Sequence, residues 1–341
     1  MKVDLPLSVP GGALGSVAEV ARAAEAGGFD GVSYSETTSD PLLHLTVAAG
    51  ATERVDLITD IIVAFARSPM TLAVQARAIQ DYSQGRLVLG LGSQIKPHIE
   101  RRFSMPWSSP AARMAEFVAA MRAIWHSWET GEKLDFRGDF YTHTLMTPMF
   151  TPPSDYPQPK VFIAGVGERM TEAAGEVADG MLIHPFSTER YLREVTLPAI
   201  ARGRQRAGRA AGDFGITSSA FIVTGRDEAE LTASATRVRE QIAFYGSTPA
   251  YRPVLELHGW AELGDDLNRL SKSQEADKWQ QMGKLIDDEV LDAFAVRGEP
   301  DRVGAALRER YSTLITRYAV NEVGIGDPTL QHQVAATLRD D

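Results

Sequence analysis

Short apolar runs alternate with helix-like segments along almost the whole chain, and this alternation restricts the fold more than any other feature. Runs of this length and composition are typical of strands buried in a parallel sheet. Most of them are followed by a segment with helical spacing, so the pattern predicts a (β/α)8 barrel rather than an open sheet. The predicted strands are Val3–Leu7, Gly31–Tyr34, Val55–Val63, Leu87–Leu91, Val161–Ala164, Met181–Ile183, Phe214–Thr224 and Arg317–Val320.

Turn and capping residues mark where the predicted helices begin and end. Ser16 and Glu19 have the spacing of a capping box, and Ser68 precedes a proline, as a helix N-cap often does. An Asp-Gly pair ends a helix and leads into a buried strand at two places. The predicted helices are Ser16–Ala26, Pro41–Ala51, Ser68–Tyr82, Ala111–Thr130, Glu168–Ala178, Glu189–Ala207, Glu228–Tyr245 and Asp301–Tyr311.

Two segments depart from the alternation. Residues 131–160 are rich in aromatic residues and proline, and we interpret them as an insertion with a short hairpin around Arg137–Gly138. Residues 246–298 contain a possible strand, Tyr251–Leu257, followed by a helix-like stretch, and we interpret them as a helical insertion before the last βα unit. We therefore expect a single barrel domain over residues 1–341 with these two insertions.

Composition excludes several classes of function. The net charge of −10 and the pI near 5.3 argue against a nucleic-acid partner or an anionic membrane surface. The absence of cysteine excludes disulfides and thiolate catalysis, and no two histidines have the spacing of metal ligands. The first residues lack a signal-peptide core, and no apolar run reaches membrane-spanning length. We expect a cytoplasmic protein with no metal and no membrane contact.

Polar residues gather directly after the strand Leu87–Leu91. Gly90 and Gly92 end this apolar run, and a loop with aromatic neighbours follows. Loops at the carboxyl ends of barrel strands carry the catalytic groups of barrel enzymes. The polar residues of this loop are Ser93, Gln94, Lys96, His98, Glu100, Arg101 and Arg102.

A second strand end leads straight into a helix at Gly165-Val166-Gly167. The backbone N–H groups at a helix N-terminus favour an anion, and Arg169 adds a cation, so a phosphate fits here. Simple helix capping, with Arg169 paired to Glu172 or Glu176, explains the same residues. Neither this turn nor Gly90-Leu91-Gly92 completes a dinucleotide-binding fingerprint.

Four titratable residues are placed for chemistry at strand ends. Glu36 follows the second strand, where a carboxylate can act as acid or base or can simply face solvent. Asp60 interrupts an apolar run, so it needs either a function or a partner such as Arg67 or Arg86. His98 lies in the polar loop and His184 ends the strand Met181–Ile183. Each histidine alone is more often structural than catalytic.

Taken together, these pieces resemble the bacterial luciferase-like superfamily and, within it, the deazaflavin-dependent oxidoreductases that use coenzyme F420. The resemblance extends over nearly the whole chain. It is carried by the order and spacing of DGVSYSETTSDP, ARSPMTLA, RLVLGLGSQIKPHIERRFSMPW, VFIAGVGERMTEAAGEVADGMLIHPF and DEVLDAFAVRGEPDRV.

The resemblance implies a barrel with an insertion, in which the cofactor ring lies across the strand ends. It implies a non-prolyl cis peptide in the third strand, which by position is Asp60–Ile61. Catalytic roles are expected for Glu36, His98 and His184. Cofactor contacts are expected for Glu36, Asp60, Ile61, Ser93, Gln94, His98, Gly165, Val166, Gly167 and Arg169.

One departure from the family pattern bears on the substrate. Sugar-phosphate dehydrogenases of this superfamily carry a catalytic histidine after the second strand, where this chain has Thr37. They also carry a glutamate near the position of Ile95 and a lysine soon after the sixth strand, where this chain reads His184-Pro185-Phe186-Ser187. We therefore expect a neutral or apolar organic small-molecule substrate.

Three functions remain open at this point. The first is hydride transfer between F420 and an organic substrate, and Lys96, Arg101 and Arg102 would suit the anionic tail of that cofactor. The second is an FMN-dependent monooxygenase of the same superfamily. The third is a flavin- or deazaflavin-binding protein without catalysis. A homodimer is expected from the resemblance.

Overall fold

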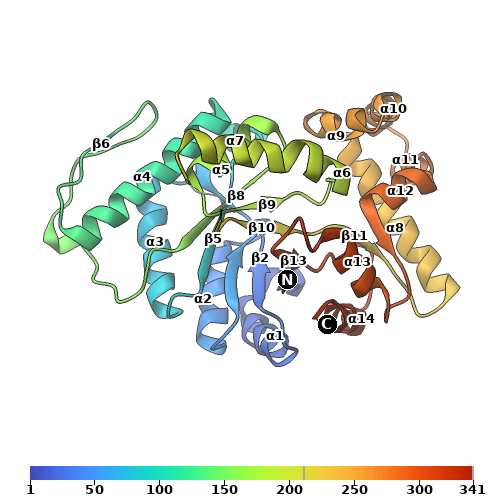
Figure 1. Ribbon diagram of the computed structural model, residues 1–341, viewed down its shortest axis with the longest axis horizontal. Coiled ribbons are helices and arrows are strands. Elements are labelled where there is room, and N and C mark those ends of the chain that lie inside the picture. The colour runs from blue at the N-terminus through green and yellow to red at the C-terminus, as the bar shows by residue number, and fades with distance from the viewer. Residues whose placement is uncertain (210–211, 340–341) are drawn as a thin grey trace.

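The computed structural model describes residues 1–209 and 212–339 and shows a closed barrel of eight parallel strands. The barrel closes because β3 pairs with β5, with Leu57 opposite Leu87 and Ile58 opposite Val88. The predicted fold class is therefore confirmed (Figure 1). The strands are β1 Lys2–Pro6, β2 Gly31–Tyr34, β3 Asp56–Thr59, β5 Leu87–Gly92, β8 Lys160–Gly165, β9 Gly180–Ile183, β10 Gly215–Ser218 and β13 Arg317–Ala319.

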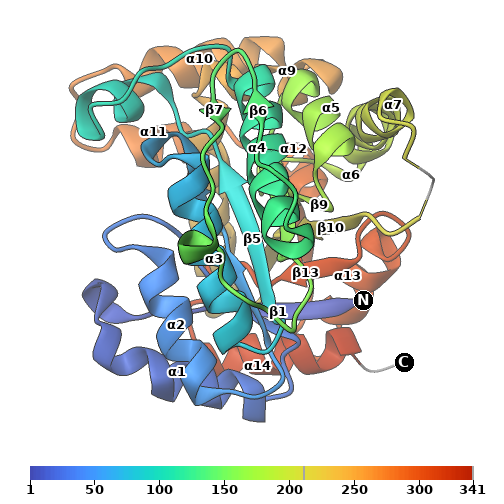
Figure 2. The same ribbon diagram turned by 90° about the vertical axis from the view of Figure 1, so that its left-hand side faces the viewer.

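Helices surround the barrel, and Figure 2 shows the wall strand β5 between α3 and α4. The C-terminal helix α14 has no counterpart among the predicted elements. The helices of the outer layer are α1 Leu14–Ala26, α2 Pro41–Ala51, α3 Pro69–Tyr82, α4 Pro110–Thr130, α5 Glu168–Val177, α7 Leu197–Arg206, α13 Val303–Tyr311 and α14 Pro328–Arg339.

The helix starts show which capping signals were right. Ser68 accepts a hydrogen bond from the Thr71 N–H, which confirms it as the N-cap of α3. The capping box predicted at Ser16 is wrong, because α1 begins at Leu14 and Ser16 lies inside its first turn. The helix predicted over 189–207 is divided into α6 (Glu189–Tyr191), a π-helical turn (Leu192–Thr196) and α7. Pro198, near the start of α7, cannot donate a backbone hydrogen bond to the preceding turn.

The two segments predicted as insertions lie at opposite ends of the molecule in Figure 1. Residues 131–160 contain the antiparallel pair β6 (Phe136–Arg137) and β7 (Thr142–His143), which confirms the hairpin. Residues 246–298 contain a short 3-10 turn (Pro249–Tyr251), four helices and a short strand. This segment begins at the end of α8 (Glu228–Gly246). Its helices and strand are α9 Arg252–Leu257, α10 Ala261–Ser271, α11 Lys278–Lys284, α12 Asp288–Phe294 and β12 Ala295–Arg297.

Two strand predictions need correction in this region. Tyr251–Leu257 is not a strand: Tyr251 ends the 3-10 turn and α9 covers the rest. Pro253 lies in the first turn of α9, where the missing N–H costs nothing. The run Phe214–Thr224 is two strands, β10 in the barrel and β11 (Phe221–Val223) outside it. Strand β11 pairs with β12, and α8 (Glu228–Gly246) follows it.

The barrel interior is filled by a small apolar cluster of Ile58, Val88, Phe162 and Leu182. The Phe162 ring occupies space that side chains at Gly180 and Gly215 would need. A Cβ at these glycines would lie 2.5 and 2.3 Å from the Phe162 Cζ atom. Because this cluster closes the lumen, the two ends of the barrel are separate surfaces.

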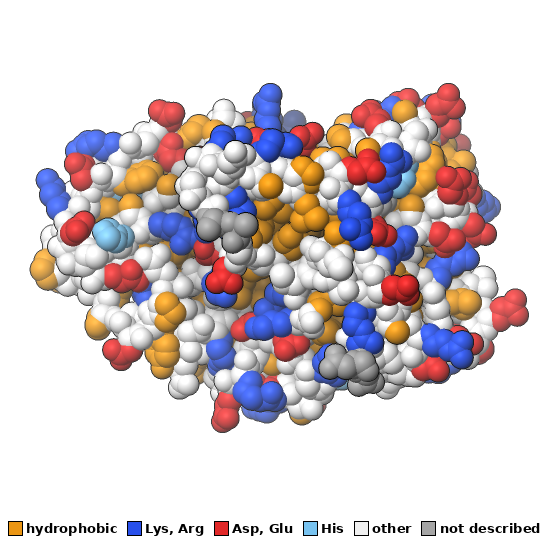
Figure 3. All heavy atoms as spheres, in the orientation of Figure 1, with side chains coloured by type: hydrophobic (Ala, Val, Ile, Leu, Met, Phe, Trp, Pro, Cys, Tyr) orange, Lys and Arg blue, Asp and Glu red, His pale blue; other side chains and the backbone are white. Residues whose placement is uncertain are grey.

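The surface carries charges of both signs. In Figure 3, lysine and arginine side chains are interspersed with aspartate and glutamate across the visible face. Within the described residues, no helix is both long enough and apolar enough to span a membrane.

Candidate active site

The predicted site residues lie at the carboxyl ends of five strands that follow one another around the barrel, in the order β2, β3, β5, β8 and β9. The carboxyl ends of parallel strands form one face of a barrel. The structure therefore brings the residues predicted from five separated sequence segments onto one arc of that face.

Glu36 holds a structural ion pair. Its Oε2 accepts hydrogen bonds from the Val63 N–H at 2.7 Å and from the Arg67 guanidinium at 2.8 Å. The Glu36 side chain is only 8% exposed. Arg67 also pairs with Asp40 at 2.8 Å, so it ties together the loops after β2 and β3. Through these contacts Glu36 fixes the shape of the site.

Asp60 and Ile61 are joined by the cis peptide bond that the resemblance implied, and this prediction is confirmed. The Asp60 N–H donates to the Tyr34 carbonyl, and the Ser35 hydroxyl donates to the Asp60 carbonyl. Neither suggested partner reaches Asp60, because Arg67 binds Glu36 and Arg86 donates to carbonyl and hydroxyl oxygens around Thr52. Burial and the nearby Asp4 raise the pKa of Asp60 to about 6.

The two glycines of β5 allow close contact with β3. A Cβ at Gly90 would lie 2.0 Å from the Thr59 carbonyl oxygen, and one at Gly92 would lie 2.6 Å from Ile61 Cδ1. These glycines are packing requirements within a strand. They let Ile61 and the cis peptide stand beside the end of β5.

The polar loop after β5 begins at the rim of the site. Gln94 adopts a left-handed conformation, with φ of 59°, and its side-chain oxygen accepts from the Ile95 N–H at 3.0 Å. Ser93 is half-buried, whereas His98 is exposed on a π-helical turn. The loop therefore places Ser93 and Gln94 inward and His98 on the outside.

The cations of this loop have different surroundings. Arg102 donates to the Thr37 carbonyl at 2.8 Å and lies over the Phe103 ring. Lys96 forms a loose pair with Glu100 at 3.7 Å, and Arg101 is exposed. Only Arg102 is fixed by the fold, so the other two side chains have retained their rotamer freedom.

The turn after β8 forms an open helix N-terminus. Gly167 is the N-cap of α5 and supplies no side-chain cap. Glu172 pairs with Arg202 and Arg206, and Glu176 pairs with Arg206, so the alternative in which either glutamate holds Arg169 is wrong. Among the ion pairs of residues 1–209 and 212–339, none includes Arg169. The first N–H groups of α5 and the exposed Arg169 are thus available to an anion.

A small cavity of about 10 Å³ lies behind this turn, and the Ser187 hydroxyl in its wall is buried without a hydrogen-bond partner. A buried hydroxyl without a partner costs free energy unless a ligand or water satisfies it. The cavity is lined by Gly165, Val166, Thr171, Ile183, His184, Phe186, Ser187, Tyr191, Thr196 and Val254.

His184 is half-buried at the end of β9 and has both ring nitrogens engaged. The Phe186 N–H donates to Nδ1 at 3.0 Å, and this fixes the ring proton on Nε2. Nε2 lies 3.1 Å from the Tyr251 hydroxyl, so the Nε2–H donates to that oxygen. Burial lowers the pKa of His184 to about 4, and the imidazole is neutral at physiological pH.

Tyr251 is the main residue of this region that sequence reasoning missed. Its ring stacks on His184 with centroids 4.5 Å apart, and Tyr245 meets the same imidazole edge-on. Burial raises the pKa of Tyr251 to about 12. No local signal pointed to this contact, because Tyr251 lies 67 residues from His184 and in a segment interpreted as a strand.

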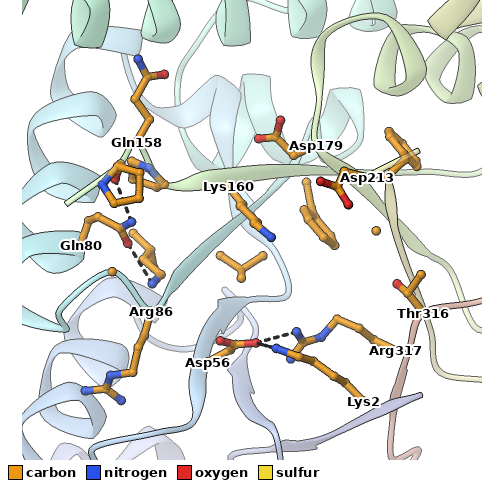
Figure 4. Close-up of a pocket in the computed structure, with 18 of the residues that line it drawn as sticks. Lys2, Asp56, Gln80, Arg86, Gln158, Lys160, Asp179, Asp213, Thr316 and Arg317 are labelled. Atoms are coloured by element: carbon orange, nitrogen blue, oxygen red, sulfur yellow. Dashed lines mark hydrogen bonds and ion pairs between the residues drawn. The ribbon is translucent and has the colours of Figure 1, made fainter. Parts of the chain in front are cut away.

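A large cavity lies at the opposite end of the barrel, the end where the strands begin (Figure 4). It has a volume of about 940 Å³ and is lined by residues at the starts of the strands, including Lys2, Asp56, Lys160 and Arg317. Lys2 and Arg317 both bind the Asp56 carboxylate, at 2.8 and 2.6 Å. Conserved chemistry in barrel enzymes belongs to the other face, and none of the predicted site residues lines this cavity.

The barrel and its carboxyl-end site define an α/β-barrel enzyme, and the sequence comparisons give its family. The family model for luciferase-like monooxygenases matches residues 2–317, and the chain belongs to this family. An uncharacterized protein of Mycobacterium tuberculosis is 55% identical over 317 residues, covering 93% of this chain and 92% of that protein.

Two further comparisons involve proteins whose names mention coenzyme F420. A putative coenzyme F420-dependent oxidoreductase of M. tuberculosis is 27% identical over 304 residues, covering 84% of each chain. The solved structure of an F420-dependent tetrahydromethanopterin reductase from Methanopyrus kandleri has a TM-score of 0.78 at 18% identity. It covers 99% of this chain and 97% of that one. The family-level resemblance is confirmed, and the match to the solved structure shows a shared fold.

Proposed function

We propose that this enzyme transfers a hydride between coenzyme F420 and a neutral or apolar organic small molecule. The observation that carries the proposal is the arc of five strand ends, which joins Asp60 and Ile61, directly after β3, to an uncapped helix N-terminus at Gly167. The F420-dependent name of one relative supports the choice of cofactor.

The residues present fit a phosphate-bearing cofactor. Gly167 leaves the α5 N-terminus open, Arg169 supplies a cation, and the buried Ser187 hydroxyl lacks a partner in the cavity behind the turn. Ser93, Gln94 and Ile61 would border the ring, and Arg102 would meet an anionic tail. When bound, the deazaflavin supplies the hydride donor or acceptor.

The protein would contribute orientation, exclusion of water and a proton. Of the three predicted catalytic residues, Glu36 is held by Arg67 and His98 is exposed, whereas His184 is half-buried and hydrogen-bonded to Tyr251. His184 donates to Tyr251, so the Tyr251 hydroxyl hydrogen is free to turn toward another acceptor. We assign proton donation to Tyr251 and its positioning to His184.

Two alternatives are kept because the family includes monooxygenases. An FMN-dependent monooxygenase would use the same phosphate cradle. A carrier would bind the cofactor without turnover. We also propose a homodimer, which the resemblance implies, and a cytoplasmic location, which the sequence pattern predicts. We call residues 131–160 the inserted arm. Its exposed side chains Leu145, Met149 and Phe150, at 77%, 85% and 63% exposure, offer an apolar surface for a second copy.

Cofactor titration followed by single-turnover reduction tests the proposal. Fluorescence titration with F420 and with FMN measures the two dissociation constants, and a panel of ketones, enones and imines is then offered to the enzyme with reduced F420. We expect tighter binding of F420 and faster oxidation of the reduced cofactor with at least one compound. Tighter binding of FMN would favour the monooxygenase, and binding without any acceleration would favour the carrier.

A further inference from the structure

Asp60 lies on the inner face of the barrel wall, at its carboxyl end. Successive residues of a strand alternate between the two faces. Asp56 lines the cavity at the amino end of the barrel, and Ile58 belongs to the apolar cluster of the lumen. Asp60 is therefore the next residue on the same inner face. The carboxyl group therefore faces the region over which the proposed cofactor ring would lie.

The positively charged side chains Lys2 and Arg317 form ion pairs at the amino end of the barrel, away from Asp60. Arg317 binds Asp4 through two nitrogens. Arg317 and Lys2 also both bind Asp56 (Figure 4). These contacts balance Asp4 and Asp56 and leave Asp60 without a counter-charge. Among the described residues, no ion pair within 4.0 Å includes Asp60.

The neighbouring strands bring no other cation to Asp60. From β2 comes Glu36, whose charge is matched by Arg67, and β5 presents glycines. On β9, His184 is neutral. The charged group that acts on Asp60 is Asp4 on β1, and it disfavours ionisation.

We propose that Asp60 is a proton-linked residue of the cofactor site, whose carboxyl group takes up one proton from solvent when the cofactor binds. This inference rests on the proposed function. A ring placed across the mouth of the barrel excludes water from Asp60 and removes the remaining solvation of the carboxylate. Without a counter-charge, the carboxyl group then becomes neutral. The neutral carboxyl group is a hydrogen-bond donor, which an ionised one is not.

Proton uptake on binding determines how the affinity for the cofactor changes with pH. Because the complex binds one more proton than the free protein, the affinity for the cofactor falls as the pH rises above the pKa of the free carboxyl group, about 6. A single linked proton raises the dissociation constant by up to about tenfold per pH unit. An Asn at position 60 has the same shape but no titration, so it removes this dependence.

The test is a fluorescence titration with oxidised F420 from pH 5 to pH 8.5, at constant ionic strength, on the wild type, Asp60→Asn and Asp213→Asn. Asp213→Asn removes the same charge, but Asp213 lines the cavity at the amino end of the barrel, away from the proposed cofactor site. Ionisation of the cofactor itself affects all three proteins alike. We expect the wild type and Asp213→Asn to lose affinity above pH 6 more steeply than Asp60→Asn. Parallel profiles for all three would overturn the inference.

Proton uptake gives a second readout that does not depend on folding of the Asn variant. Calorimetric titration of the wild type at pH 7 in two buffers of different ionisation enthalpy counts the protons taken up. We expect a larger count for the wild type than for Asp60→Ser, and equal counts would contradict the inference. If the wild type binds no F420 at any pH, the proposed function fails first and the inference fails with it.

Discussion

At the scale of single residues, the site is governed by which polar groups have partners. Glu36 and Arg67 satisfy each other, whereas the half-buried Asp60 has no charged side-chain partner and the buried Ser187 hydroxyl has no hydrogen-bond partner among the described residues. Unsatisfied buried groups cost stability, so a fold tolerates them where a ligand completes them. This division separates the residues that shape the site from those that meet a ligand.

Asp60→Asn should stabilise the protein at neutral pH. The folded protein binds the Asp60 proton up to a pKa of about 6, against 3.8 for an unperturbed aspartate, so stability is lost as the pH rises through this window. The shift corresponds to about 3 kcal/mol. Denaturant unfolding at pH 8 should show a gain of up to about this size, and at pH 3.5 none. A gain of equal size at both pH values would show that packing, not ionisation, causes it.

His184 should have the opposite effect on stability. Its folded pKa of about 4 lies below the ordinary 6.5, so the unfolded chain binds the proton more readily and stability is lost as the pH falls from 6.5 to 4. In the Asp60→Asn background, where the opposing effect is absent, stability should rise between pH 4 and 6.5. Replacement of His184 by Gln should flatten that rise. An unchanged slope would remove the assignment of a neutral imidazole.

Tyr251→Phe should lower turnover without weakening F420 binding. Loss of a general acid typically costs about 10² to 10⁴ in rate, while the ring stacking on His184 stays intact. Histidine 15N NMR should show the Nε2–H tautomer of His184 in the wild type and a shifted Nε2 signal in the variant. Unchanged turnover, or a proton on Nδ1, would return proton transfer to another residue.

At the scale of elements, small residues decide where helices and strands meet. The α5–α7 contact needs Gly203, because a Cβ there would lie 1.9 Å from the Glu172 carbonyl oxygen. Gly167 differs: nothing lies within 4 Å of its Cβ position, and its φ of −94° suits any residue.

These two glycines make a matched pair of variants. Gly203→Ala should destabilise the fold by at least about 1–3 kcal/mol through overpacking. Gly167→Ala should leave the unfolding free energy within about 0.5 kcal/mol of the wild type. The added methyl group should nevertheless weaken F420 binding, because it stands at the anion-binding end of α5. Thermal unfolding and cofactor titration of both variants check this, and undiminished binding by Gly167→Ala would place the phosphate elsewhere.

The positions of most strands and helices, and the polar residues that follow the strands, could be predicted from the sequence. Apolar runs and caps such as Ser68 identified the barrel strands and most helices, because each depends on local chemistry. Tyr251 and the two strands within 214–224 were misassigned, since tertiary contacts decide them. The contact between Tyr251 and His184, and the charge balance that isolates Asp60, depend on side chains far apart in sequence. Only the fold could reveal them.

At the scale of the whole molecule, the two ends of the barrel have different chemistry. The amino end combines a large cavity with the ion cluster of Lys2, Asp56 and Arg317. The carboxyl end gathers the open helix N-terminus, the cis peptide and the His184–Tyr251 pair. The apolar side chains packed in the lumen separate these two surfaces.

The inserted arm offers a test of the proposed dimer. Met149 is 85% exposed and Leu145 is 77% exposed, so neither contributes much to the core of one chain. Light scattering should give the mass of two chains for the wild type. If the arm lies in the interface, Met149→Glu combined with Leu145→Glu should give one chain without loss of folded signal. A wild-type monomer would contradict the dimer.

The position of bound F420 tests the central claim most directly, and a crystal structure of the complex would determine it. The account predicts the ring across the ends of β3 and β5, beside Asp60–Ile61, with the phosphate at the N-terminus of α5 near Gly167 and Ser187. Cofactor density in the cavity at the amino end, beside Lys160 and Arg317, would contradict the account. So would a phosphate remote from α5.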